Sequence, residues 1–132
     1  MAFLLDTNVA IHLRDGDAGV RRRLAAIGSE FYLSVVSRVE LENGVHAEPS
    51  ESLLRRRALD RMLRQIGTLE FRIEEVDAYA SIVVAIGYAR RKTIDRMIAA
   101  TALVHDLTLI TFNGRDFSDV PGLKLEAWKA PA

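Results

Sequence analysis

Four acidic residues stand where apolar runs of the sequence end or helices begin: Asp6, Glu40, Asp95 and Asp116. Asp6 directly follows the apolar run 3–5, which is long enough for a strand buried on both faces. Glu40 comes shortly after a run rich in β-branched and aromatic residues, and Asp116 follows the last long apolar run. In an open parallel sheet, ligands bind at the carboxyl ends of the strands, so we expect these acids to share one edge.

Several carboxylates packed at one edge repel one another and raise each other's pKa, which a fold tolerates when cations neutralise them. The sequence has no cysteine, and His12, His46 and His105 are too scattered to form a histidine site. Oxygen ligands alone favour Mg²⁺ or Mn²⁺. Such ions act mostly on phosphates, so the four acids predict metal-dependent hydrolysis of phosphodiester bonds.

Three of the four acids also have a purely structural interpretation. Asp6 can cap the helix that follows it. Ser37 and Glu40 fit the S-x-x-E capping box, in which the glutamate reaches back to the backbone N–H of the serine. Asp95 lies in the first turn of a predicted helix, where the helix dipole favours an anion. The functional interpretation therefore depends on all four acids lying together.

Basic residues gather in three clusters, of which the last, Arg90-Arg91-Lys92, directly precedes Asp95. The other two are Arg21-Arg22-Arg23 and Arg55-Arg56-Arg57 with Arg61 and Arg64. Arginine suits bidentate contacts to phosphate, so we expect Arg90, Arg91 and Lys92 to bind phosphates near the acids. The alternative is that these clusters are solvated helix faces.

The elements that position the acids alternate along the chain. Hydrophobic patterning predicts strands at 3–5, 31–36, 69–73, 107–111 and 123–127. It predicts helices at 8–14, 18–27, 37–47, 52–66, 76–92 and 94–105, with Leu54, Leu59 and Met62 facing inward from the fourth of these. This alternation favours an α/β fold with a mostly parallel sheet of about five short strands covered on both faces.

The totals describe an ordinary globular protein. The 132 residues are 49% hydrophobic and 27% charged, with equal numbers of acidic and basic residues, which predicts one domain over 1–132. Without cysteine, disulfides and thiolate sites are excluded, which suits a reducing cytoplasm. The N-terminus lacks the pattern of a secretory signal, and no apolar run has membrane-spanning length, so we expect a cytoplasmic protein without membrane contact.

Four blocks of the sequence together resemble the PIN-domain ribonucleases, and most of all the toxin subunits of VapBC-type pairs, including their FitB-like branch. The blocks are Leu4-Leu5-Asp6-Thr7-Asn8-Val9, the stretch 34–41 with Gly44, Asp95-Arg96-Met97-Ile98-Ala99-Ala100-Thr101-Ala102, and Thr111-Phe112-Asn113-Gly114-Arg115-Asp116-Phe117. They occur in the family's order and with its spacing over nearly the whole chain, so the ordered set is specific.

The resemblance implies a three-layer α/β/α fold and an endoribonuclease that uses Mg²⁺ or Mn²⁺. It carries the three invariant acids of the family onto Asp6, Glu40 and Asp95, and the fourth, variable acid onto Asp116. Polar positions that support the acids fall on Thr7, Asn8, Thr111 and Asn113, the last in a loop where some relatives use an acid. It also implies a homodimer, a cognate DNA-binding antitoxin and higher toxin–antitoxin assemblies.

Rival interpretations fit less well. Aspartyl-phosphate phosphatases also begin with an apolar strand ending in Asp, but they need a second Asp where this chain has Asn8. A receiver-like domain needs a lysine near the pocket late in the chain, and Lys124 and Lys129 follow the last predicted loop. A module that binds RNA or protein without cleaving is the main alternative, and metal-dependent RNA cleavage distinguishes the two.

Overall fold

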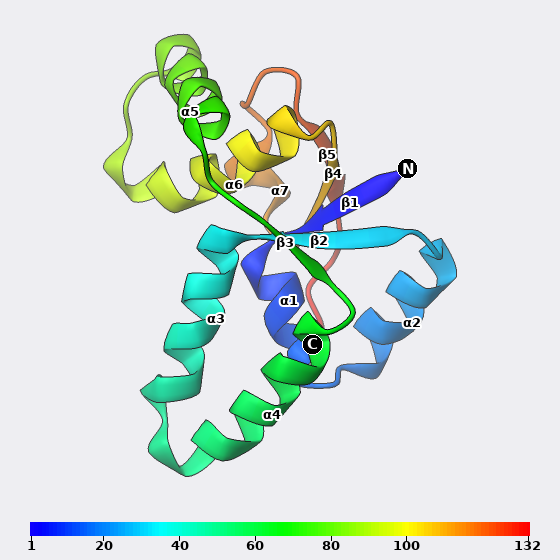
Figure 1. Ribbon diagram of the computed structural model, residues 1–132. Helices are drawn as coiled ribbons and strands as arrows, with labels where there is room; N and C mark the ends of the chain where they lie inside the picture. Colours follow the sequence, from blue (N-terminus) through cyan, green and yellow to red (C-terminus); the bar gives the residue numbers. More distant parts are fainter.

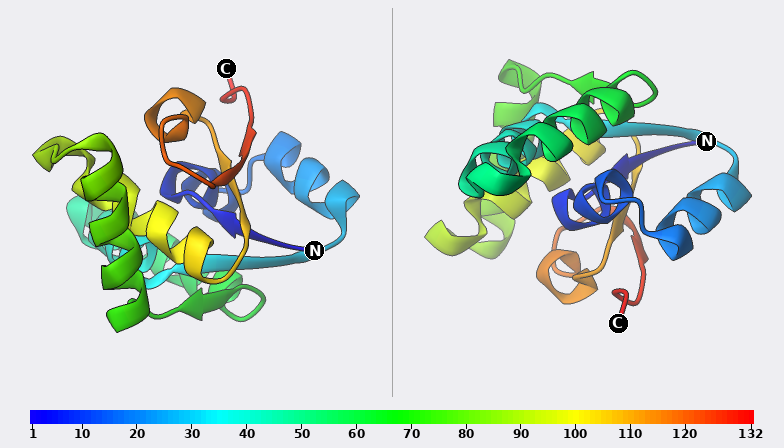
Figure 2. Two further views of the ribbon diagram at one scale, coloured as in Figure 1. Left: turned by 90° about the horizontal axis from the view of Figure 1, so that it is seen from above. Right: turned by 90° about the horizontal axis from the view of Figure 1, so that it is seen from below.

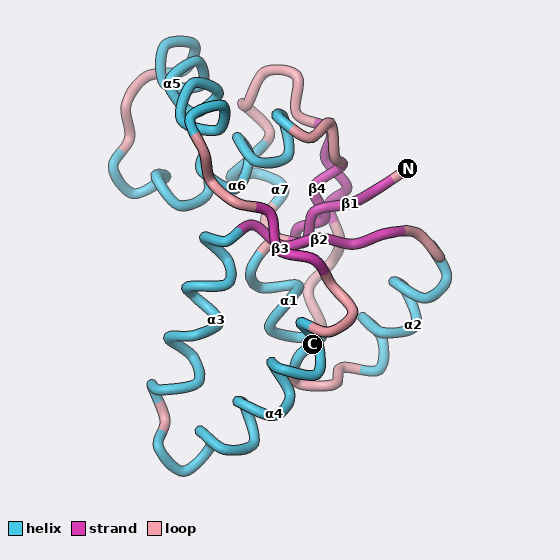
Figure 3. Tube along the Cα trace, in the orientation of Figure 1, coloured by secondary structure: helices cyan, strands magenta, loops and turns pink.

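The centre of the molecule is a parallel five-stranded sheet in the order β3-β2-β1-β4-β5. It is seen in a computed structural model that describes residues 1–132 (Figures 1 and 3). The strands are β1 (Ala2–Leu5), β2 (Glu30–Ser34), β3 (Gly67–Leu69), β4 (Thr108–Thr111) and β5 (Lys124–Ala127). In register, Leu4 of β1 lies beside Tyr32 of β2 on one side and Leu109 of β4 on the other. The predicted parallel sheet of about five strands is confirmed.

Helices cover both faces of this sheet, as the two views in Figure 2 show. The α-helices are α1 (Thr7–Arg14), α2 (Ala18–Ile27), α3 (Val35–Ala47), α4 (Ser52–Leu63), α5 (Ile73–Ile86), α6 (Thr93–Val104) and α7 (Gly114–Phe117). Two 3₁₀ turns, η1 (Pro49–Glu51) and η2 (Arg90–Lys92), precede α4 and α6. None of the helices combines the length and apolar character needed to cross a membrane. The architecture is the three-layer α/β/α arrangement.

Alternate side chains of the central strands enter two separate cores, which explains why those strands are apolar throughout. Phe3 and Leu5 join the core under α1, α2, α3 and α4. Leu4, between them, joins the core under α5, α6 and α7. The small residues Ala99, Ala100 and Ala102 of α6 are fully buried in that second core, so this helix approaches the sheet closely.

The junction after β2 differs from its prediction. The strand ends at Ser34, two residues earlier than expected, and Ser34 caps α3 by accepting a hydrogen bond from the Val36 N–H at 3.1 Å. Ser37 and Glu40 therefore lie inside α3, and the predicted capping box between them is wrong. Because the Ser34 hydroxyl caps the helix, the β-branched residues Val35 and Val36 belong to α3 and not to the strand.

The segment from 63 to 92 also differs. Helix α4 ends at Leu63, β3 is Gly67–Leu69 rather than 69–73, and α5 already begins at Ile73. The predicted long helix 76–92 ends at Ile86, because Gly87 has φ +88° and ψ 158°. That conformation is open only to glycine and cannot continue a helix.

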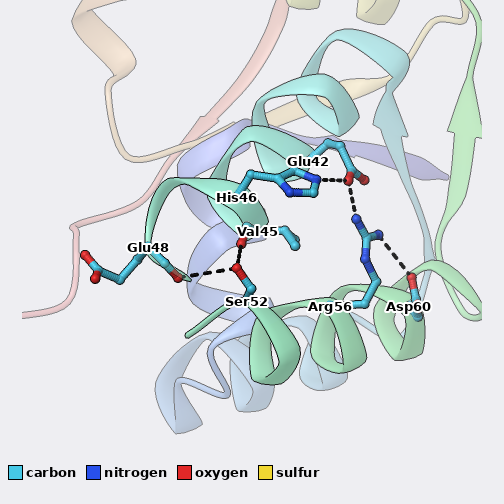
Figure 4. A network of polar contacts seen from close by, with 7 residues as sticks. All are labelled: Glu42, Val45, His46, Glu48, Ser52, Arg56 and Asp60. Atoms are coloured by element: carbon cyan, nitrogen blue, oxygen red, sulfur yellow. Dashed lines mark hydrogen bonds and ion pairs between the residues drawn. The ribbon is translucent and has the colours of Figure 1, made fainter. Parts of the chain in front are cut away.

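Helices α3 and α4 form a hairpin tied together by polar side chains (Figure 4). Arg56 of α4 binds Glu42 of α3, which also contacts His46 at 2.8 Å, and Arg56 reaches Asp60 at 3.5 Å. Ser52 donates to the Val45 carbonyl at 2.6 Å. With its α3-facing side engaged in this way, α4 presents Leu53 and Leu54 to solvent, 64% and 68% exposed. The prediction that Leu54 faces inward is wrong, whereas Leu59 and Met62 are buried as predicted.

Candidate active site

Asp6 lies at the carboxyl end of β1 and is the most enclosed of the four acids. It is 5% exposed, and both carboxyl oxygens accept hydrogen bonds. The backbone N–H of Thr7 donates to Oδ1 at 2.9 Å, and the hydroxyl of Thr111, at the end of the neighbouring strand β4, donates to Oδ2 at 2.6 Å. Asp6 is thus also the N-cap of α1, so the structural role proposed for it is real and coexists with any chemistry.

The pKa of Asp6 is raised above its ordinary value, chiefly because the group is buried. The hydrogen bonds from Thr111 and Thr7 work in the opposite direction. The charges of Glu40 and Asp116 raise this pKa further.

Glu40 is held by a hydroxyl group from another helix. The Thr7 Oγ1 donates to Glu40 Oε1 at 2.6 Å and lies 2.8 Å from Ser37 Oγ. A hydroxyl carries one proton, so Ser37 donates to Thr7 while Thr7 donates to Glu40. Ser37 is fully buried. The sequence analysis assigned Ser37 to a helix cap and missed its hydrogen bond to Thr7. The available signal was the spacing of Ser37 and Glu40, which puts both on one face of a helix, one turn apart.

Asp95 lies in the first turn of α6 and is half-buried. Its pKa is raised to about 6, first by burial and then by the charges of Asp6, Asp116 and Glu40, while Lys92 acts weakly in the opposite direction. The carboxyl of Asp95 accepts no hydrogen bond, in contrast to Asp6 and Glu40. Asp6 at the end of β1 and the acids of α3, α6 and α7 therefore lie within electrostatic range of one another.

Asp116 and the basic turn η2 flank the same edge. Lys92 Nζ lies 3.8 Å from Asp116 Oδ1. A cavity of about 470 Å³ is lined by Ala89, Arg90, Arg91, Lys92, Asp95 and Asp116. The structure thus brings the third basic cluster of the sequence beside two of the acids. The other two clusters lie on α2 and around α4.

The two asparagines predicted to support the site lie at its margin. Asn8 is exposed on α1, and Asn113 is exposed at the start of α7. The backbone N–H of Asn113 donates to Thr111 Oγ1 at 3.0 Å, which orients the hydroxyl that holds Asp6. Neither asparagine side chain makes a hydrogen bond to an acid. No three acidic or histidine side chains are close enough, as they stand, to form a ready metal site.

A parallel sheet covered by helices on both faces, with acids at its carboxyl edge, belongs to the class of open α/β folds that bind their ligands at that edge. The PIN domain model matches residues 3–123, and the chain belongs to this family. The resemblance to its VapC branch is confirmed. The chain is 32% identical to "Ribonuclease VapC1" of Rickettsia felis over 95% of each protein. It is 30% identical to "tRNA(fMet)-specific endonuclease VapC" of Shigella flexneri over 97% of this chain and 98% of that one.

Solved structures agree with the fold. VapBC2 from Rickettsia felis, bound to a DNA fragment from its promoter, superposes with a TM-score of 0.84 at 23% identity, covering 97% of this chain and 99% of that one. FitAcB from Neisseria gonorrhoeae superposes with a TM-score of 0.74 at 28% identity, covering 95% and 96%. The PIN fold predicted from the sequence blocks is therefore confirmed along the chain.

Proposed function

We propose that this protein is a metal-dependent endoribonuclease and the toxin of a toxin–antitoxin pair. In this proposal Asp6, Glu40, Asp95 and Asp116 hold one or two Mg²⁺ or Mn²⁺ ions. The observation that carries it is the gathering of three further carboxylates, from α3, α6 and α7, around buried Asp6 at the end of β1, with Lys92 as the only cation paired to any of the four. The relatives named ribonuclease and endonuclease support RNA as the substrate.

The chemistry of the residues fits such an ion. The donors are all carboxylate oxygens, which hard divalent cations prefer. Burial, and after it repulsion by the neighbouring acids, raises the pKa of Asp6 and Asp95, and a cation would relieve this repulsion. Asp95 accepts no hydrogen bond, so its side chain can rotate toward the others. A bound divalent ion would make a water molecule more acidic and offset the negative charge that develops on the phosphate oxygens.

The residues of the chain supply the remaining functions. Thr111 and the Thr7 N–H fix both oxygens of Asp6, and Thr7 with Ser37 behind it fixes Glu40. Such hydrogen bonds from surrounding residues hold metal-binding carboxylates in one orientation. Arg90, Arg91 and Lys92, which border the cavity beside Asp95, would bind the RNA backbone phosphates next to the cleaved bond.

Removing the metal is the direct test of this proposal. RNA incubated with the purified protein should be cleaved in Mg²⁺ or Mn²⁺ and stay intact in excess EDTA, with activity restored when the ion is added back. Gel analysis of a labelled RNA measures both states. Cleavage that persists in EDTA would exclude the metal mechanism. Binding of RNA without cleavage under every metal condition would favour the alternative function, a non-cleaving binding module.

We also propose that an antitoxin covers the face formed by α1, α2 and α4. Two adjoining cavities of about 380 and 410 Å³ lie there, bordered by apolar Leu13, Met62 and Ile66 and by several arginines. Leu54, 68% exposed, borders the second cavity. An apolar helix with acidic residues would match this surface. The solved structures of VapBC and FitAB complexes support a partner of this kind.

A separate face suits the proposed homodimer. Helix α5 carries Ile73, Val76 and Val84 exposed to solvent, at 71%, 46% and 87%, and Tyr88 just after the helix is 71% exposed. A surface with this many exposed large apolar side chains marks a contact site. A second copy of the chain is the occupant we assign to it, leaving the α1–α2–α4 face for the antitoxin.

These two assignments predict opposite behaviour for two matched substitutions. Leu54→Glu should weaken co-purification with the antitoxin encoded beside the gene by about tenfold or more, because it places a charge in the apolar contact. Val84→Glu should leave antitoxin binding intact and instead shift the protein alone toward a monomer. Pull-down and size-exclusion chromatography with light scattering measure both effects. Retained antitoxin binding in Leu54→Glu would show that the antitoxin uses another face.

A further inference from the structure

Arg96 is a buried charge that none of the functions described above explains. It follows Asp95 in α6, is 4% exposed and forms no ion pair. Its Nη1 donates to the backbone carbonyl of Gly87 at 2.6 Å, and its Nε has no hydrogen-bond partner. One bond to a neutral carbonyl does not offset the cost of removing a guanidinium from water. The bond from Arg96 to Gly87 therefore adds little to the stability of the fold, but it fixes the position of the Gly87 carbonyl relative to α6.

The constraint acts on the connection from α5 to α6. Gly87 ends α5, with its N–H bonded to the Val83 carbonyl at 2.8 Å. Its φ of +88° with ψ 158° is open to glycine alone, although no atom lies within 4 Å of the place where a Cβ would stand. Glycine is thus required at this position for its φ and ψ angles and not for space. With these angles the Gly87 carbonyl points toward Arg96.

The residues after Gly87 form the basic turn beside the acids. Within it, the Lys92 N–H donates to the Ala89 carbonyl at 2.9 Å, and Thr93 Oγ1 donates to the Arg90 carbonyl at 2.8 Å. These bonds join the turn to the start of α6 at one end only. The bond from Arg96 to Gly87 fixes the other end. In Figure 1 this connection lies at the outer end of α5 and α6, where no strand supports it.

We propose that Arg96 is a positioning residue for RNA binding: by holding Gly87 it keeps the turn 87–92 in place, so that Arg90, Arg91 and Lys92 face the backbone phosphates of a single-stranded RNA at the edge of the acidic site. This inference rests on the proposed function, in which that turn contacts RNA. Arg96 itself is buried and touches no phosphate, so any effect of changing it on RNA binding passes through the turn.

The test measures binding of a short, fluorescein-labelled single-stranded RNA of mixed sequence by anisotropy, in EDTA so that no cleavage occurs. Arg96→Met should weaken binding by about tenfold, the effect of losing one or two charge-assisted contacts. It should also flatten the dependence of log affinity on log salt concentration, since three cations contribute a slope of up to about 2 on single strands. The melting temperature should change by no more than about 4 °C, because the buried guanidinium contributes little stability.

A double-mutant cycle separates positioning from general damage. In a protein that carries Arg90→Ala, Arg91→Ala and Lys92→Ala, adding Arg96→Met should cause no further loss, because the residues that it positions are already gone. Gly87→Ala tests the other partner of the same bond and should reproduce the flattened slope even if Arg96→Met does not fold. Gly28→Ala, at the positive-φ cap of α2, is the matched control and should retain the wild-type slope.

Unchanged affinity and slope in both Arg96→Met and Gly87→Ala would overturn the inference, as would an additive loss in the combined variant. If the triple variant itself binds RNA with full affinity and slope, the proposed contact between the turn and RNA fails as well, and the inference fails with it. If the triple variant loses affinity while Arg96→Met and Gly87→Ala do not, only the positioning role is excluded and the proposed function stands.

Discussion

The substitution Asp6→Asn is expected to leave the protein folded and to reduce RNA cleavage by about a thousandfold or more. Asp6 is the acid around which the others gather, and it is the only one with both oxygens fixed, by Thr7 and Thr111. An amide has one oxygen in place of two and no charge, so it is a much weaker ligand for Mg²⁺ or Mn²⁺. The effect on the rate should therefore far exceed the effect on the fold.

The fold should survive for a local reason. The amide oxygen of Asn can still accept one of the two hydrogen bonds, and the Thr111 hydroxyl can accept from the new NH₂ group instead of donating. Removing a buried charge that is repelled by Glu40 and Asp116 also relieves an unfavourable interaction. The melting temperature of Asp6→Asn should accordingly equal or exceed that of the wild type in EDTA.

The measurement is the rate of RNA cleavage at saturating Mn²⁺, together with a thermal melt of the same preparation. Asp119→Asn is the matched control, since Asp119 is exposed just beyond α7 and is not among the acids whose charges raise the pKa of Asp6 or Asp95. It should retain the wild-type rate. Wild-type cleavage by folded Asp6→Asn would falsify the assignment of the acidic edge as the catalytic site.

Asp95→Asn is expected to change activity and stability in opposite directions. The carboxyl of Asp95 has its pKa raised to about 6 from an ordinary value of 3.8. At pH 7 the group is ionised in both the folded and the unfolded chain, and its charge is disfavoured only in the folded one. Without solvent screening, this rise in the pKa of Asp95 would correspond to a loss of about 3 kcal/mol in the free energy of unfolding. Because the side chain is half-exposed, solvent screening reduces the expected gain in Asp95→Asn to about 1–2 kcal/mol.

The pH dependence follows from the sign of this shift. The folded protein binds the proton of Asp95 more tightly than the unfolded chain does, so stability is lost as pH rises from about 4, through the folded pKa near 6. Below about pH 4 the group is protonated in both states, and the advantage of Asp95→Asn should disappear. Above about pH 6 the stability of Asp95→Asn should exceed that of the wild type by its full amount. Chemical denaturation of both proteins in EDTA across this range measures the difference.

Added Mn²⁺ should reverse the order of stability. An ion that binds only the folded wild type stabilises it in proportion to the logarithm of the ion concentration, and Asp95→Asn should gain less because it has lost a ligand. RNA cleavage by Asp95→Asn should fall by about a hundredfold or more. A variant less stable than the wild type in EDTA at pH 7 would contradict the electrostatic account of this site. Retained activity would remove Asp95 from the set of ligands.

The position of the acids could be predicted because the signals for strand ends are local. The run before Asp6 is apolar on every residue, which in a short segment indicates a strand buried on both faces. The same reasoning placed Asp116 after the strand that became β4, and Asp95 in the first turn of α6. In each case the pattern of a few neighbouring residues determines whether they form a strand or a helix. The position of the acid at the end or start of that element can then be read from the sequence. The metal ions and the RNA assigned to these acids stay predictions.

Boundaries were less predictable where two local signals compete. At 34–40, β-branched residues favour a longer strand, while two serines can each cap a helix. In the structure Ser34 is the cap, and its hydroxyl accepts a hydrogen bond from the Val36 N–H. Helix α3 therefore begins at Val35, and Glu40 lies within the helix instead of in its first turn. Likewise, Leu54 has the spacing of an inward residue but is exposed, because the packing of α4 against α3 and α1 sets the orientation of that helix.

The amino-acid sequence by itself determined the alternation of strands and helices, the apolar character of β1 and β4, and the placing of acids at strand ends and helix starts. Only the tertiary structure decided which side chains hold those acids. The strand order places β4 beside β1, and this brings the Thr111 hydroxyl to Asp6 across 105 positions of sequence. The bond between Arg96 and the Gly87 carbonyl likewise depends on α5 packing against α6. Hydrophobic periodicity is a property of neighbours in the chain, whereas a hydrogen bond between distant residues exists only after strands have paired and helices have packed.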